Sequence, residues 1–450
     1  MTTARVDIAD VIDRAPIGRT QIAIFTLCAL CLIMDGFDVQ ALGYAAPAII
    51  QDWHIPVAAL GPVYGASNFG VLVGQLVFAM LADKIGRRPV LIAGAFFFGL
   101  VTLATTRVTT VQQLLVIRFI AGIGLGAILP NAVALAGEYS ARRLRVTVMS
   151  LMGVGFTSGA AIGGFLAAWL IPIFGWPAVF YFGGAVPLVL ASAMLVWLPE
   201  SLPFLVVRER RPTYVAAWVR RLDPSLVIDM STRFAFAEER HGGVPVIHLF
   251  REGRAVGTLL IWVVNFMNLL NLYFLANWLP TVVRGGGYST STAVLVGTTL
   301  QVGGVIGTFV LTWLIARRGF FTVLTSTFAV ACLSVALIGR PGLSLALLVT
   351  VVFIAGSCVV GSQPTINALS GTYYPTYLRS TGIGWSLGIG RMGAIVGPVA
   401  AGILIGLHWS SDALFLAAAV PALVSALAMF ALRFALRLPA TDIEPVVAGN

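Results

Sequence analysis

The sequence predicts an all-α membrane protein in which twelve transmembrane helices form two pseudo-symmetric bundles of six. Three features support this fold class: the composition, the number of apolar spans and an internal repeat. Of the 450 residues, 58% are hydrophobic and 10% are charged, which lies outside the range of soluble globular proteins. The formal net charge of +10 comes from basic residues scattered over short loops, as in membrane proteins, and not from a nucleic-acid-binding face.

Apolar spans long enough to cross a bilayer recur along the whole chain. With a window of about 19 residues, they lie near 21–48, 59–82, 88–106, 112–139, 146–172, 177–198, 255–282, 290–316, 320–339, 342–371, 380–407 and 412–437. A long polar segment follows the sixth span, and a basic helical stretch is expected in it around 207–221. The predicted domains are an N-terminal six-helix bundle (1–198), a cytoplasmic central loop (199–254) and a C-terminal six-helix bundle with a short cytoplasmic tail (255–450).

The distribution of basic residues predicts the orientation. If both termini lie inside, 23 of the 28 lysines and arginines fall in internal segments. Arg107, Arg284 and Arg340 then fall outside, and Arg118 and Arg391 lie within spans. Because the internal loops of membrane proteins are enriched in Lys and Arg, the sequence predicts cytoplasmic termini and a cytoplasmic central loop.

The two halves are related in sequence. A constant offset of 234 residues aligns the loop and helix after the fourth span with the loop and helix after the tenth. Identical residues at this offset include Tyr139 and Tyr373, Arg145 and Arg379, Gly159 and Gly393, and Gly163 and Gly397. Six spans separate the two copies, so both cross the membrane in the same direction, as parallel repeats do.

Two carboxylates interrupt the first span, in the sequence Asp35-Gly36-Phe37-Asp38. A carboxylate at the centre of a bilayer costs about 2.5 to 3.5 kcal/mol on insertion scales, so such residues mark functional sites. The spacing places both acids on one helical face, and Gly36 allows the backbone to loosen between them. Two carboxylates this close resist ionising together, a property that suits a proton carrier.

The loop after the second span has a recognisable charged pattern. Its sequence is Ala79-Met80-Leu81-Ala82-Asp83-Lys84-Ile85-Gly86-Arg87-Arg88. An acid beside cations can form a charge network that holds two helices in one arrangement, although an ordinary positive-inside turn is the alternative interpretation. The segment resembles the signature loop between helices two and three of the major facilitator superfamily, with Ala79 where that family usually has glycine. The second copy, Ala316-Arg317-Arg318-Gly319, is degraded and has Ala316 where an acid is common.

Other segments resemble one branch of that superfamily, the aromatic acid/proton symporter family, which includes 4-hydroxybenzoate and benzoate transporters. The stretch from Asp35 to Asp38 is similar to the DGxD motif of its first helix. Further similar segments are Arg118-Phe119 with Gly122, Gly124 and Gly126, Leu129-Pro130-Asn131, Trp197-Leu198-Pro199-Glu200-Ser201, Asn277-Trp278-Leu279-Pro280, and Tyr374-Pro375-Thr376 with Gly388-Ile389-Gly390-Arg391. The resemblance covers nearly the whole chain, and it implies import of a benzoate-like acid with protons into bacteria.

Two arginines lie inside predicted spans, where an unpaired cation is costly. For Arg118 the candidate partners are Asp35 and Asp38, and the alternative is a direct role in substrate binding or protonation. Arg391 has Thr157 as its counterpart in the repeat, so no symmetric structural need explains it. Because an arginine fork matches a carboxylate in two hydrogen bonds, we expect Arg391 to anchor the substrate carboxylate. Binding of helix-end carbonyls is the alternative.

Polar and aromatic side chains that suit a binding cavity recur in the seventh, tenth and eleventh spans. They are Asn265, Asn268, Asn271, Gln363, Asn367 and Trp385. In a membrane, amides need hydrogen-bond partners on other helices or a water-filled cavity. As a set they predict a substrate cavity with polar edges and flat aromatic faces for a substituted ring, although helix packing alone would explain each one individually.

Glu138 ends the fourth span close to Arg142, Arg143 and Arg145. We interpret Glu138 and Arg145, together with Asp83, Arg87 and Arg88 of the signature loop, as a conformational latch. Proton transfer by Glu138 is the alternative. The histidines and cysteines lack metal-ligand spacing, so neither a metal site nor a disulfide framework is predicted.

The sequence therefore predicts a transporter, not an enzyme, that works by alternating access and needs no cofactor besides a proton gradient. Its expected partners are protons, an aromatic carboxylate and the lipid bilayer, with no nucleic acid, and it is expected to act as a monomer in a bacterial inner membrane. The alternatives are a proton-coupled efflux transporter and a sugar or organic-acid porter of the same superfamily. Gly163-Gly164 stands where antiporters commonly have a Gly-Pro pair, which favours import, whereas Pro199-Glu200-Ser201 resembles a sugar-porter motif.

Overall fold

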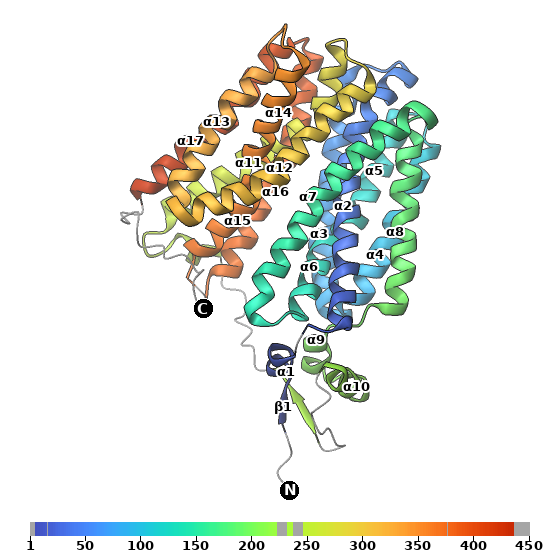
Figure 1. Ribbon diagram of the computed structural model, residues 1–450, viewed down its shortest axis with the longest axis vertical. Coiled ribbons are helices and arrows are strands. Elements are labelled where there is room, and N and C mark those ends of the chain that lie inside the picture. The colour runs from blue at the N-terminus through green and yellow to red at the C-terminus, as the bar shows by residue number, and fades with distance from the viewer. Residues whose placement is uncertain (1–4, 16, 223–231, 237–245, 376, 436–450) are drawn as a thin grey trace.

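Helices of membrane-spanning length dominate the computed structural model (Figure 1). The structure describes residues 5–15, 17–222, 232–236, 246–375 and 377–435. Within these residues, twelve helical segments are long and apolar enough to cross a membrane. They divide into six before and six after the central segment. The predicted all-α membrane fold is confirmed, while the tail predicted after residue 435 lies outside the described residues.

Each half of the chain builds its six spans from seven α-helices. In the N-terminal half these are α2 (Arg19–Trp53), α3 (Gly61–Ile85), α4 (Arg87–Ala104), α5 (Val111–Gly126), α6 (Ile128–Glu138), α7 (Arg142–Phe174) and α8 (Pro177–Trp197). In the C-terminal half they are α11 (Ala255–Gly285), α12 (Thr290–Arg318), α13 (Phe320–Ile338), α14 (Leu345–Val359), α15 (Ser362–Tyr373), α16 (Arg379–Gly406) and α17 (Ser411–Ala435). Short 3-10 turns at Val57–Leu60, Thr105–Arg107 and Val246–Phe250 precede α3, follow α4 and precede α11.

The fourth and tenth spans are each interrupted, into α5 with α6 and into α14 with α15. Pro130 and Pro364 lie in the first turn after each interruption. A proline cannot donate to the carbonyl four residues earlier and its ring clashes there, so the helix hydrogen-bond ladder breaks at this point. The two prolines are 234 residues apart, the offset of the sequence repeat. The repeat therefore extends to a local feature of the backbone that the motifs alone did not predict.

Single glycines make the turns between α3 and α4 and between α12 and α13. Gly86 has φ 111° and Gly319 has φ 76°, each with an extended ψ. Side chains with a Cβ rarely adopt this conformation, which explains why the degraded second copy of the signature loop still ends in glycine.

Close helix packing follows the same repeat. A Cβ placed on Gly159 of α7 would meet the carbonyl of Ile33 on α2, and one on Gly393 of α16 would meet the carbonyl of Phe266 on α11. In each half, the fifth span thus lies directly against the first span at a position that only glycine allows. This supports the interpretation of the glycine-rich stretches as helix-packing surfaces.

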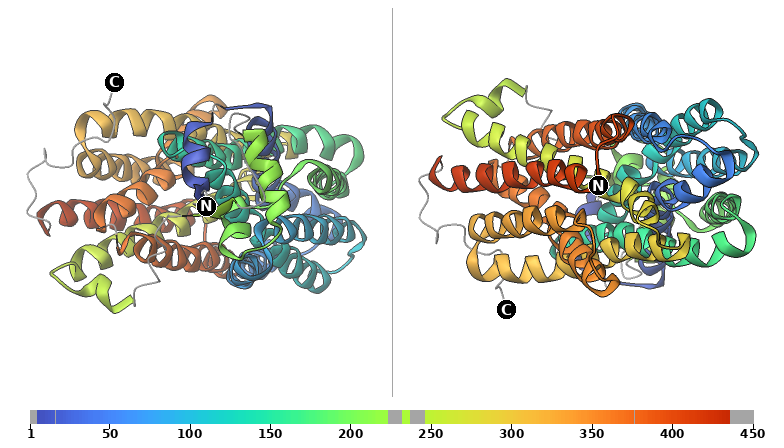
Figure 2. Two further views of the ribbon diagram at one scale, coloured as in Figure 1. Left: turned by 90° about the horizontal axis from the view of Figure 1, so that it is seen from below. Right: turned by 90° about the horizontal axis from the view of Figure 1, so that it is seen from above.

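The halves lie side by side, as the blue-to-green and yellow-to-red ribbons of Figure 2 show. We call the end that carries the short helices α1, α9 and α10 the terminal end, and the other the opposite end (Figure 1). In the part of the chain that the structure describes, one apolar cluster combines side chains of both halves, including Leu42, Tyr64, Trp278 and Leu279. Toward the terminal end, each half has an apolar cluster of its own. The halves are therefore joined mainly toward the opposite end.

Hydrogen bonding and close backbone contacts also join the halves away from the terminal end. The side-chain amide of Gln40 on α2 donates to the carbonyl of Ala276 on α11 at 2.8 Å. A Cβ on Gly61 of α3 would meet Gly402 of α16. These contacts place α2 against α11 and α3 against α16.

A small unit at the terminal end was not expected from the sequence. It combines β1 (Arg5–Asp7), α1 (Ile8–Arg14), α9 (Leu202–Val207), α10 (Pro212–Leu222) and β2 (Arg233–Ala235). The two strands pair in parallel, and apolar side chains of α1, α9 and α10 join the apolar cluster of the N-terminal half. The basic helix expected around 207–221 begins only at Pro212, because Glu209 and Arg211 adopt positive φ angles of 50° and 51°.

Candidate functional site

A buried ion pair joins α2 to α5 near the middle of the N-terminal half. The Nη2 atom of Arg118 lies 2.6 Å from Oδ2 of Asp38, and Nη1 donates to Oδ1 at 3.3 Å. Both side chains are 1% exposed, and the Arg118 Cζ atom lies 5.6 Å from the centroid of the Phe180 ring. Of the two acids predicted as candidates, Asp38 is thus the partner of Arg118. The pair neutralises both charges within the apolar interior.

Asp35 lies one helical turn before Asp38 and is 4% exposed. In the part of the chain that the structure describes, its carboxyl group has no ion-pair or hydrogen-bond partner. It lies within electrostatic range of Asp38 on its own helix and of Arg391 on α16. The two aspartates are therefore chemically distinct: Asp38 is held by Arg118, whereas Asp35 is left to respond to charges that reach it from the other half.

Arg391 lies near the middle of α16 and is half-buried. Its Nη1 atom donates to the hydroxyl of Tyr273 on α11 at 3.1 Å. The described residues give Arg391 no carboxylate within ion-pair distance, so its charge is only partly satisfied by this one neutral group. A half-buried guanidinium with free donors can bind a carboxylate in a bidentate arrangement.

Four of the predicted amides form one network beside Arg391. Gln363 of α15 donates to Oδ1 of Asn265 at 2.9 Å and to Oδ1 of Asn367 at 3.3 Å, and it accepts from Nδ2 of Asn268 at 2.8 Å. Asn265 also donates to the Ser386 hydroxyl of α16 at 2.8 Å. Gln363 and Asn367 are half-buried, whereas Asn265 and Asn268 are 0% and 2% exposed. The network thus links α11, α15 and α16. Its two residues on α15, Gln363 and Asn367, are more exposed than its two residues on α11.

Two predicted substrate-binding residues lie apart from this network. Asn271 is 1% exposed, and neither atom of its amide has a hydrogen-bond partner among the described residues. Trp385 is 45% exposed and stacks on Trp262 of α11 with ring centroids 5.9 Å apart. Trp385 lies on α16 between Arg391 and the terminal end of that helix, and the structure brings it to Trp262 rather than to the amide network.

The predicted latch residues are only partly brought together. Nε of Arg87 lies 2.8 Å from Oε1 of Glu138, which ties α4 to α6, and the charge of Arg145 also acts on Glu138. Arg88 instead donates to the main-chain carbonyl of Leu198 at 2.6 Å. Asp83 is exposed, and among the described residues its carboxylate has no ion pair. Asp83 does not join the network because α3 ends with its side chain pointing to the surface.

Residues 28–390 match the Major Facilitator Superfamily. The chain belongs to that superfamily. As one of its members, it is a multi-pass membrane transporter and not an enzyme, which confirms both predictions. The six spans of each half form one of its two bundles.

Among known members of the superfamily, similar proteins are aromatic acid transporters. The chain is 38% identical to the 4-hydroxybenzoate transporter PcaK of Pseudomonas putida, over 92% of this chain and 93% of that protein. It is 39% identical to a gallate transporter of Pseudomonas putida, over 95% of each chain. These matches confirm the resemblance to the aromatic acid branch that the motifs predicted.

A solved structure supports the same fold at much lower sequence identity. The crystal structure of a bacterial homologue of the human lysosomal transporter Spinster, in an inward-facing and unoccupied conformation, aligns with a TM-score of 0.70. It has 17% sequence identity and covers 93% of this chain and 98% of that chain. At this identity the comparison concerns the superfamily fold alone.

Sequence reasoning missed three residues of the site. Tyr273 was visible as a polar group in the seventh span, but nothing in the sequence linked it to Arg391. Nothing in the sequence singles out Ser386 as a site residue, because serine is common in helices. Glu200 was noted only within a motif, yet its Oε1 accepts hydrogen bonds from the main-chain nitrogens of Arg87, Arg88 and Ser201 at 3.1, 3.2 and 2.8 Å. It therefore caps the start of α4.

Proposed function

We propose that this superfamily member imports an aromatic carboxylate together with protons by alternating access. The observation that carries the proposal is the placement of the unpaired acid Asp35 within electrostatic range of Arg391 across the two halves. The relatives named as 4-hydroxybenzoate and gallate transporters support an aromatic acid as the substrate class. The proton gradient supplies the energy, and no cofactor takes part.

Asp35 and Asp38 have different roles in this proposal. Asp38 is held by Arg118, which donates two hydrogen bonds to it in a buried pair. Asp35 has no such partner, and an ionised carboxylate buried without one is costly. Asp35 therefore takes up the proton, and its neutralisation changes the charge that Arg391 experiences.

Arg391 and the amide network form the substrate site in this proposal. Arg391 holds the substrate carboxylate while Tyr273 fixes the orientation of its guanidinium. Gln363 and Asn367, the half-buried members of the network, contact the ring substituents, and Asn265 and Asn268 hold Gln363 in place. Without a proton on Asp35, the substrate carboxylate and Asp35 repel each other while both compete for Arg391. Protonation removes that competition, which couples the two species.

The direction of opening is part of the proposal. The halves are joined toward the opposite end and have separate apolar clusters toward the terminal end, which supports a state open toward the terminal end. The excess of basic residues in the predicted internal segments supports a cytoplasmic terminal end in a bacterial inner membrane. The Arg87 and Glu138 pair acts as a latch that keeps α4 and α6 together while the halves rock.

The test is transport in proteoliposomes with a panel of labelled aromatic acids. Wild-type protein should accumulate one or more of them when the outside is acidified, and should show no accumulation without a gradient. Asp35→Asn should lose gradient-driven accumulation but keep counterflow, the exchange of labelled for unlabelled substrate, because exchange requires the substrate site without net proton movement. Asp52→Asn is the matched control, since Asp52 lies on the same helix but is exposed at the opposite end and accepts from Trp176 at 3.0 Å.

Two results would contradict the proposal. Gradient-driven accumulation that persists unchanged in Asp35→Asn would remove that residue as the coupling site. Proton-driven export of the labelled acids, with no uptake, would show an efflux transporter.

A further inference from the structure

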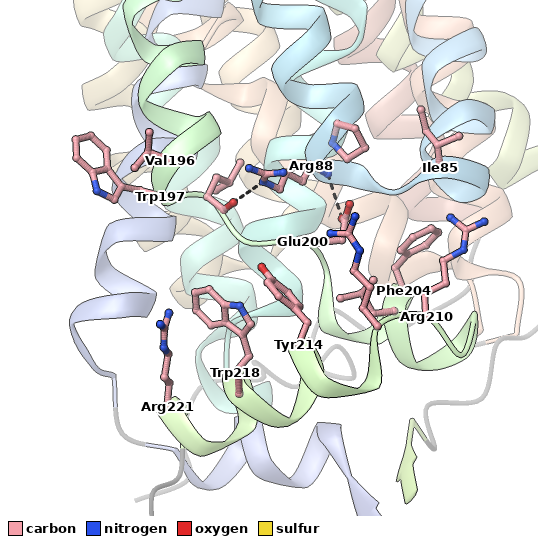
Figure 3. A pocket seen from close by; sticks show the side chains of 15 residues that line it. Ile85, Arg88, Val196, Trp197, Glu200, Phe204, Arg210, Tyr214, Trp218 and Arg221 are labelled. Atoms are coloured by element: carbon pink, nitrogen blue, oxygen red, sulfur yellow. Dashed lines mark hydrogen bonds between the residues drawn. The ribbon is translucent and has the colours of Figure 1, made fainter. Parts of the chain in front are cut away.

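A cavity outside the transport site lies at the terminal end of the N-terminal half. It has a volume of about 600 Å³ and is bounded by the start of α4, the end of α8, and α9 with α10. Among the described residues, four arginines line it, Arg88, Arg210, Arg211 and Arg221, and one carboxylate, Glu200. Figure 3 shows Tyr214 and Trp218 rising from α10 toward Arg88, with Trp197 at the end of α8. The cavity is thus strongly basic and partly aromatic.

The positive charge of this cavity is not neutralised by its one acid. Glu200 is 9% exposed, and its Oε1 accepts hydrogen bonds from two main-chain N–H groups at the start of α4 and from the N–H group of Ser201. Within the described residues, none of the four arginines forms an ion pair. Arg88 donates to main-chain carbonyls, and the Cζ atom of Arg221 lies 5.1 Å from the centroid of the Trp218 ring. Arg210 and Arg211 are exposed. The excess of positive charge therefore makes the cavity suited to bind an anion.

The cavity lies next to side chains that face lipid, and this position indicates which kind of anion can reach it. The last residues of the α8 span project apolar side chains outward beside it: Leu195, Val196 and Trp197 are 51%, 73% and 65% exposed. In a membrane-spanning helix these side chains contact lipid tails, and a tryptophan at a span end marks the level of the headgroups. The cavity thus lies where phospholipid headgroups begin, with an acyl-chain surface next to it.

We propose that this cavity binds the phosphate headgroup of an anionic phospholipid of the adjacent leaflet. Arg210, Arg211 and Arg221 contact the phosphate, since guanidinium groups bind phosphate oxygens through charge-assisted hydrogen bonds. Trp197 and the neighbouring apolar residues of α8 contact the glycerol and the start of the acyl chains. The bound lipid ties α10 to the ends of α4 and α8, so it stabilises the small unit at the terminal end against the bundle. The proposal does not depend on the identity of the transported substrate.

Native mass spectrometry of the purified, delipidated chain tests the proposal. The probes are phosphatidylglycerol, which is anionic, and phosphatidylethanolamine, which is zwitterionic, titrated separately and in competition. The wild-type protein should retain one phosphatidylglycerol with a preference of about tenfold or more, because each nearby arginine strengthens binding to anionic lipid several-fold. The triple variant Arg210→Gln/Arg211→Gln/Arg221→Gln should lose this preference. Arg88 is left intact, because its contacts hold the end of α8.

A matched variant removes the same charge from the terminal end of the other half. Arg317→Gln/Arg318→Gln/Arg433→Gln alters three exposed arginines of α12 and α17 and should keep the preference for phosphatidylglycerol. If the triple cavity variant does not fold, Arg221→Gln alone, on an exposed side chain, should lower retention about fivefold. A further experiment adds inorganic phosphate as a competitor to the wild-type protein, which should keep its phosphatidylglycerol bound.

Three outcomes would overturn the proposal. Wild-type protein that retains both lipids equally has no anionic lipid site. Equal loss in the cavity variant and the matched variant would show only diffuse attraction between basic loops and anionic lipid. Displacement of the lipid by millimolar inorganic phosphate would show a site for a soluble anion instead.

Discussion

Replacing Asp38 with asparagine tests how the buried pair in the N-terminal half contributes to stability. The substitution keeps the size of the side chain and removes the charge that faces Arg118. The guanidinium would remain 1% exposed without its ionised partner, held only by an amide and by the Phe180 ring at 5.6 Å. Removing one partner of a buried ion pair costs about 3 to 5 kcal/mol. We expect Asp38→Asn to lower the free energy of unfolding by that amount.

Asp35→Asn provides the internal comparison, three residues earlier on the same helix. The described residues give Asp35 no ion-pair partner, so the neutral asparagine breaks no ion pair. We expect this substitution to change the free energy of unfolding by less than about 1 kcal/mol. The double variant Asp38→Asn/Arg118→Gln should recover most of the loss, because two amides can hydrogen-bond without a buried charge.

Unfolding can be followed with a thiol-reactive dye. Cys28 and Cys31 of the same helix are free and are 0% and 3% exposed, so they react only when the bundle opens. Titration with SDS from mixed micelles gives the free energy of unfolding for the wild type, the two single variants and the double variant. The reasoning is refuted if Asp38→Asn is as stable as Asp35→Asn, or if the double variant Asp38→Asn/Arg118→Gln is less stable than Asp38→Asn.

Three further predictions concern other parts of the chain. Arg391→Lys should raise the KM for the transported acid about tenfold or more in proteoliposomes, because lysine lacks the guanidinium fork, and Tyr273→Phe, which removes one neutral hydrogen bond, should raise it only a few-fold. Equal effects of the two substitutions would contradict this. Glu200→Ala should lower stability by about 2 to 3 kcal/mol in the same unfolding assay, since three main-chain N–H groups lose their acceptor. Gly159→Val should prevent α7 from packing on the main chain of α2 and abolish monodisperse protein in size-exclusion chromatography, whereas Gly153→Val, which has open space for a Cβ, should leave the elution profile unchanged.

Much of the site could be named from the sequence because charges in apolar spans are rare. Asp35, Asp38, Arg118 and Arg391 each stand out against an apolar background, and their cost in a bilayer makes them candidates without further information. The choice of partner for Arg118 could not be made in the same way. Asp35 and Asp38 share a helical face, so only the rotation of α2 against α5 decides which of them the guanidinium reaches.

The partners of the amides could not be predicted from the sequence either. Asn265, Asn268 and Asn271 have similar spacing and similar chemistry in the sequence, yet only the first two join the network around Gln363. A difference of one helical turn places Asn271 in an interior where its amide has no partner among the described residues. Spacing along one helix fixes which side chains share a face, but not which neighbouring helix that face meets.

By itself, the sequence determined the membrane class, the count of spans, the parallel repeat and the superfamily. These depend on local quantities: the length of apolar segments, the placement of glycines and prolines, and the distribution of arginines. The tertiary structure alone decided which aspartate Arg118 holds, that Tyr273 contacts Arg391, and that α1, α9 and α10 fold into a unit beside a basic cavity. Each of these is a contact between segments far apart in the chain. Their geometry depends on helix rotation and crossing, which no local pattern encodes.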